Sequence, residues 1–132
     1  MRAFDTNVVV RVLVRDDPVQ CEVARSAWVD ALASGGAFLS KVLAELAWVL
    51  GSSFKMQRRA VVDLLRTVIS FEGVVVEDEA VVLAALDAFN GGVAGFSDCL
   101  VLATARAANA LPLVTFDVGL AREADVRLLP SE

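Results

Sequence analysis

The sequence predicts a single α/β domain over residues 1–132, with a mostly parallel central sheet of about five short strands flanked by helices. Three observations predict this class. Short apolar runs alternate with longer segments of helical periodicity. Most of the runs are bounded by glycine, proline or acidic residues, as buried parallel strands tend to be. The length allows one substantial core and is too short for two ordinary domains.

Five apolar runs are the expected strands: residues 3–4, 37–39, 74–76, 113–115 and 126–129. Between them, segments 24–32 and 61–69 carry apolar residues at the i, i+3, i+4, i+7 spacing of a helix with one buried face. Polar residues mark the expected helix starts. They are Asp17 before Pro18, Ser40 for a helix through Leu50, Asp78 for one through Phe89, and Ser97 just before a run through Asn109.

Two expected helices, residues 42–50 and 99–108, are apolar nearly all round. Such helices are buried on several sides, in the core or against a partner chain. Because one small subunit would struggle to cover both, we expect a homodimer.

Composition excludes several functions. Hydrophobic residues make up 57% of the chain, which argues against disorder, and histidine is absent. Its absence removes Ser-His-Asp and Cys-His nucleophile systems and histidine-based zinc sites. Cys21 and Cys99 are expected to be buried free thiols.

Location and charge also limit the possibilities. No apolar run approaches the roughly 20 residues that span a bilayer, and Asp5 stands where a signal peptide needs apolar residues. We therefore expect a cytoplasmic protein without a membrane anchor. The net charge of −5 argues mildly against a general nucleic-acid coat.

Four acidic residues stand at positions typical of a site. Asp5 follows the first expected strand and Asp117 the fourth, and open α/β sheets place their sites at the carboxyl ends of strands. Glu45 is the only charge between residues 42 and 50, and Asp98 opens the second apolar helix. Structural interpretations remain open: Asp5 and Asp98 can serve helix starts, and Asp117 a turn. Glu45 is the hardest to explain, because burying it unpaired would cost several kcal/mol.

Taken together, the four acids predict a metal site. Carboxylates about 4 Å apart repel by roughly 4 kcal/mol per pair at an effective dielectric near 20, so a cluster needs cations or protons. Hard oxygen ligands suit Mg²⁺ or Mn²⁺, which activate water and stabilise charge on a phosphate. This chemistry requires no histidine and points to phosphodiester hydrolysis.

The four acids lie in motifs that resemble those of the PIN-domain family, in particular VapC-type toxins of toxin–antitoxin systems. The opening Phe4-Asp5-Thr6-Asn7-Val8 is similar to the family's D-T-N/S motif, and Thr115-Phe116-Asp117 to its closing T-x-D. Glu45 matches the second acid and Asp98 the third. The resemblance covers essentially the whole chain.

The resemblance implies a Mg²⁺- or Mn²⁺-dependent endoribonuclease, a hydrolase that cuts RNA, with tRNA and ribosomal RNA as candidate substrates. It also implies a homodimer and a small cognate antitoxin that blocks the site. Asp5, Asp98 and Asp117 would be direct metal ligands, and Glu45 a ligand or the group that orients the attacking water. Relatives often carry a further acid after the T-x-D aspartate; here Val118-Gly119-Leu120 follow, which leaves one or two metal ions open.

The residues around these acids have expected roles as well. Thr6, Asn7 and Thr115 are candidates to orient carboxylates or a phosphate. RNA contacts are expected from Lys41, Lys55, Arg58 and Arg59, and from Arg11 and Arg15, one turn apart on the first helix. The basic run 55–59 is equally typical of a solvated helix start.

Three other functions share some of these features. A haloacid-dehalogenase-like phosphatase needs a second aspartate where Asn7 stands. A non-catalytic PIN-like module for binding RNA or protein would not need all four acids. A metal-dependent nuclease acting on DNA has the same site, and only the resemblance favours RNA.

Overall fold

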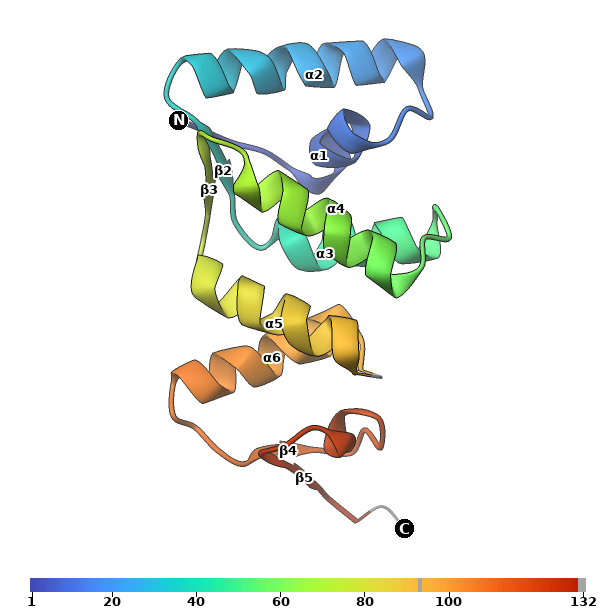
Figure 1. Cartoon of the computed structure of the whole chain (residues 1–132), viewed down its shortest axis with the longest axis vertical. Helices are drawn as coiled ribbons and strands as arrows, with labels where there is room; N and C mark the ends of the chain where they lie inside the picture. Colours follow the sequence, from blue (N-terminus) through green and yellow to red (C-terminus); the bar gives the residue numbers. More distant parts are fainter. Residues whose placement is uncertain (93, 131–132) are drawn as a thin grey trace. The chain divides into compact units, whose positions relative to one another are not determined.

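The computed structural model describes residues 1–92 and 94–130 (Figure 1). The chain divides into two compact units, Met1–Glu79 and Ala80–Glu132.

The first unit contains a three-stranded parallel sheet in the order β1-β2-β3. Its elements are β1 (Arg2–Ala3), α1 (Thr6–Leu13), α2 (Pro18–Ala33), β2 (Ala37–Leu39), α3 (Val42–Ser52), α4 (Arg58–Ser70) and β3 (Val74–Val76). In the sheet Phe38 lies beside Ala3 on one side and Val75 on the other. Helix α1 packs against α2 and α3, and α3 packs against α4.

The second unit contains two helices and a pair of parallel strands. Its elements are α5 (Glu79–Gly91), whose first residue ends the first unit, α6 (Phe96–Ala107), β4 (Leu113–Thr115), a 3₁₀ turn η1 (Leu120–Arg122) and β5 (Val126–Leu128). Strands β4 and β5 pair in parallel. The rings of Phe89 in α5 and Phe96 in α6 meet edge to face, 5.8 Å between centroids.

The predicted α/β class is confirmed: among the described residues, five short strands with parallel pairing lie near the expected positions and alternate with helices along the chain. The described strands form two separate sheets, one of three strands and one of two, and not a single five-stranded sheet. The first strand is shorter than expected, although the Phe4 amide still donates to the Phe38 carbonyl at 3.2 Å.

The predicted helix starts are confirmed in part. Asp17 caps α2, its side chain accepting from the Gln20 amide at 3.1 Å, with Pro18 in the first turn. Ser40 is not a cap, because α3 begins at Val42 with Lys41 before it. Ser97 lies inside α6, which already begins at Phe96. Asp78 directly precedes α5, but its φ of 54° is not the extended conformation of a capping residue.

The core of the first unit gathers on one face of each helix. In α3 the buried residues are Leu43, Leu46, Ala47 and Leu50, whereas Trp48 is 67% exposed. Within the single chain this helix is therefore buried on one face only, and burial of its other face against a partner chain stays a prediction. Cys21 and Cys99 are buried free thiols, as predicted. Among the described residues, no helix is long and apolar enough to cross a membrane.

The orientation of α3 leads to a stability prediction. Leu46→Ala, at a fully buried position, is expected to lower the free energy of unfolding by about 2–5 kcal/mol. Trp48→Ala, two residues away on the exposed face, should change it by less than about 0.5 kcal/mol. Urea unfolding of both variants measures the difference. Equal losses would mean that the helix is rotated from the orientation described.

Candidate functional site

Asp5 stands at the junction of β1 and α1. Its backbone is extended, and its carboxylate Oδ1 accepts from the Thr6 amide at 2.7 Å, so it is the N-cap of α1. The carboxylate is held by this bond and by the positive end of the helix. Within the described residues its second oxygen has no hydrogen-bond partner, and the side chain is exposed. The cap interpretation is confirmed, and one oxygen remains available for a ligand.

The Thr6 hydroxyl is unusual for a buried group. Thr6 is only 3% exposed, and its Oγ1 has no hydrogen-bond partner among the described residues. Thr6 lines a pocket of about 320 Å³ together with Asn7, Glu45 and Asp16. Because an unpartnered buried hydroxyl is costly, its position beside carboxylates is consistent with a polar ligand in this pocket.

Glu45 lies in the first turn of α3 and is exposed. Glu45 is therefore not buried, contrary to the sequence-based expectation, and it lines the pocket. Asp16, which the motifs did not single out, lines the same pocket, and its Oδ2 lies 3.4 Å from Nη1 of Arg11. No periodicity reveals Asp16; it reaches the pocket because α1 stops at Leu13 and the chain turns back.

The other two acids belong to the second unit. Asp98 is half-buried in the first turn of α6, with no hydrogen bond or ion pair to the described residues. Asp117 follows β4, and its Oδ1 accepts from the Leu120 amide at 3.0 Å, while its own amide donates to the Thr115 hydroxyl at 2.9 Å. Asp117 is thus a turn residue, as the structural alternative states, and again has a second oxygen to offer.

Each unit therefore supplies two of the four acids: Asp5 and Glu45 in the first, Asp98 and Asp117 in the second. Within neither unit do the described residues form a group of three or more acidic or cysteine side chains able to hold a metal ion. The donor set still fits Mg²⁺ or Mn²⁺ chemically, because it consists of carboxylates with free oxygens, next to an unpartnered hydroxyl. That these four acids share one site stays a prediction.

The expected RNA-contacting residues differ in their surroundings. Lys41 Nζ lies 2.7 Å from Glu77 Oε1 and 4.0 Å from Asp78; the hydrogen bond and charge of Glu77 raise the pKa of Lys41. Lys41 is thus already paired with an acid. Arg58 and Arg59 open α4, where no side chain caps the helix, and Lys55 lies shortly before it.

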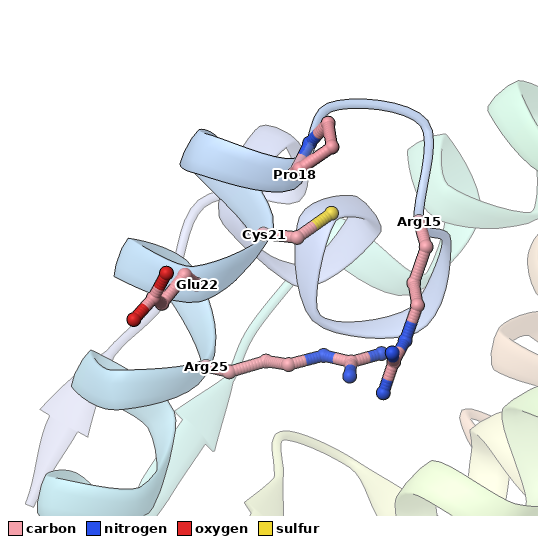
Figure 2. A pocket seen from close by; sticks show the side chains of 5 residues that line it. All are labelled: Arg15, Pro18, Cys21, Glu22 and Arg25. Carbon is pink, nitrogen blue, oxygen red and sulfur yellow. The ribbon is translucent and has the colours of Figure 1, made fainter.

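Arg11 and Arg15 are not on one helix, because α1 ends at Leu13 and Arg15 lies in the connection to α2. Arg11 is held by Asp16 and by Gln20, whose Oε1 accepts from its Nε at 2.8 Å. Arg15 instead lines a second pocket, together with Arg25 from α2 (Figure 2). Arg25 was not predicted as an RNA-contacting residue, because the segment around it is marked in the sequence only by its apolar helical periodicity.

These features define a parallel α/β protein with carboxylates after its strands and in the first turns of its helices. The chain belongs to the PIN-domain family: the family model described as "PIN domain" matches residues 3–126, nearly the whole chain. PIN domains are generally metal-dependent nucleases. A comparison with curated proteins gave no match.

The unpartnered hydroxyl leads to a second prediction. Thr6→Val replaces it with a methyl group of the same shape, and we expect the free energy of unfolding to rise by about 1 kcal/mol, measured by urea unfolding with a chelator present. Thr6→Ser keeps the hydroxyl and should show no such gain. A loss of stability in Thr6→Val would mean that the hydroxyl has a partner in the folded protein.

Proposed function

We propose that this chain is a Mg²⁺- or Mn²⁺-dependent endoribonuclease and the toxin of a toxin–antitoxin pair. The observation that carries the proposal is the match of the PIN family to residues 3–126. Asp5, Glu45, Asp98 and Asp117 fall within this range, in motifs that resemble those of the family. The toxin role and the RNA substrate rest on the resemblance of the motifs.

In this proposal Asp5, Asp98 and Asp117 bind the metal directly. Asp5 and Asp117 suit the task because each carboxylate is fixed by a backbone amide through one oxygen and has the other to offer. A fixed carboxylate loses less side-chain freedom when it binds an ion, which favours affinity. Asp98 is half-buried and has no hydrogen-bond or ion-pair partner among the described residues. A bound cation would offset the free-energy cost of burying its charge.

When bound, the metal supplies an activated water and stabilises the negative charge that develops on the phosphate. Glu45 either completes the ligand set or accepts a hydrogen bond from the attacking water and orients it. Its exposed position at a pocket supports the second role, because water reaches it freely. With no histidine in the chain, a carboxylate is the available base.

Neighbouring polar groups position these acids. The Thr115 hydroxyl accepts from the Asp117 amide and fixes the turn that presents the carboxylate. Thr6 donates its amide to Asp5 and lines the pocket of Glu45 and Asn7. Substitution of such supporting residues typically costs activity without removing a ligand.

The first test is RNA cleavage by Asp5→Asn and Asp98→Asn. Asparagine caps helices as well as aspartate does, so Asp5→Asn should keep its fold and melting temperature. Because asparagine replaces one carboxylate oxygen with an NH₂ group and removes the negative charge, we expect Mg²⁺-dependent cleavage to fall by at least about a hundredfold. Cleavage of a labelled single-stranded RNA at matched enzyme concentrations measures it.

Asp30→Asn is the matched control, since Asp30 lies exposed near the end of α2, and it should cleave at the wild-type rate. Wild-type rates for Asp5→Asn or Asp98→Asn would refute the site. A folded wild-type protein that binds RNA without cutting it would favour the binding-module alternative. Preferential cleavage of DNA of the same sequence would favour the DNA nuclease.

The toxin role has its own test. We expect expression of the wild-type chain to arrest growth, expression of Asp98→Asn not to, and co-expression of a small gene encoded beside it to restore growth. Colony counts under induction measure the effect. Normal growth on wild-type expression, with cleavage activity intact in vitro, would leave a nuclease that is not a toxin. Size-exclusion chromatography of the same protein tests the expected homodimer.

A further inference from the structure

We propose that Arg15 and Arg25 form a binding site for a backbone phosphate of RNA, beside the pocket that holds Glu45. This inference rests on the proposed function for the identity of the polyanion. The two side chains come from different elements, Arg15 from the connection between α1 and α2 and Arg25 from α2, and they line one pocket of about 430 Å³. Figure 2 shows the two guanidinium ends pointing toward one another across this pocket.

The arrangement is held by the backbone at the end of α1. Arg25 Nε donates to the Val12 carbonyl at 3.1 Å, and the Cys21 thiol donates to the Val14 carbonyl at 3.0 Å. Both bonds tie α2 to the residues that lead into Arg15. They leave the two Nη groups of Arg25 and the whole guanidinium of Arg15 without a partner among the described residues. These N–H groups form a planar fork of the kind that binds phosphate through two parallel hydrogen bonds.

No acid among the described residues forms an ion pair with Arg15 or Arg25. Asp16 is paired with Arg11, and Asp17 accepts from the Gln20 amide as the cap of α2. Glu22 lines the pocket, but in Figure 2 its carboxylate points away from both guanidinium groups. Two cations that face each other repel, and an anion between them removes this repulsion. The pocket is therefore complementary to a negatively charged group.

Its position favours a phosphate of a nucleic-acid chain over an isolated anion. Arg15 lines this pocket, and the next residue, Asp16, lines the pocket of Glu45 and Thr6. When one phosphate of an RNA chain lies near Glu45, the negative charges of Asp5, Asp16 and Glu45 repel it. Arg15 directly precedes Asp16 and shares its pocket with Arg25, so the two cations would offset that repulsion on a neighbouring phosphate. Proteins commonly bind single-stranded nucleic acid through basic grooves that follow its backbone.

The test is the salt dependence of binding by the whole protein in a chelator, where nothing is cleaved. The probe is a fluorescent single-stranded RNA, and its affinity is measured from about 50 to about 200 mM salt. DNA of the same sequence and polyglutamate are measured in the same way for comparison. Arg15→Gln/Arg25→Gln should bind RNA about tenfold more weakly, and the slope of log affinity against log salt should become shallower by roughly 0.7 for each phosphate that the variant no longer neutralises. Arg15→Lys/Arg25→Lys keeps the charge and should recover most of the slope.

Arg127→Gln is the matched control, because it removes one exposed positive charge from β5 in the other unit and should leave affinity and slope unchanged. Arg15→Gln alone keeps the bond of Arg25 to Val12, so it remains informative if the double variant is unstable. Unchanged RNA binding in Arg15→Gln, or an equal loss in Arg127→Gln, would overturn the site, as would a wild type that binds no RNA. Weakened binding of polyglutamate with unchanged RNA binding would also overturn it in favour of an acidic protein segment.

The result separates this site from the proposed function. If the arginine variants bind RNA normally while wild type cleaves it, the site is wrong and the nuclease stands. If they lose binding while wild type cleaves no RNA in Mg²⁺, the phosphate site stands and the nuclease is wrong.

Discussion

The junction between β1 and α1 is the constraint on which the first unit depends. Phe4 is anchored on both sides: its amide donates to the Phe38 carbonyl in β2, and its ring meets Trp28 of α2 edge to face at 5.1 Å. The next residue, Asp5, must then turn the chain out of the sheet and begin a helix, and its carboxylate caps the helix that it starts. An apolar anchor and a polar cap in adjacent positions fix the carboxylate relative to the sheet.

The structural roles of Asp5 and Asp117 are compatible with the metal-binding roles proposed for them. Asp5 caps α1 and Asp117 accepts from the turn at Leu120, each through one oxygen. A capping aspartate is held in place by the backbone, which is the property that a metal ligand needs, and both side chains are exposed to solvent. A residue selected for either role would look alike in sequence, and only a cleavage assay distinguishes the two.

The sequence predicted the strands well because five short apolar runs bounded by turn residues leave few other interpretations. It predicted the helix starts at Ser40 and Ser97 poorly, because serine is found both before and within the first turn of helices, and the exact start depends on how the chain enters the helix. Glu45 shows a different limit. Its apolar neighbours suggested burial, but α3 buries only one face, and Glu45 lies with Trp48 on the other. Composition along a helix does not reveal how much of its circumference the fold covers.

The sequence did not reveal the position of Arg25 either. That position matters for how an acidic protein could bind a polyanion. With a net charge of −5, long-range attraction for a polyanion is weak, so the proposed RNA contacts would have to come from cations placed locally. Lys41 is occupied by Glu77, and Arg11 by Asp16. What remains near the Glu45 pocket is the pair of arginines that the end of α1 brings together from different elements. Their pairing follows from where α1 stops, which no spacing in the sequence records.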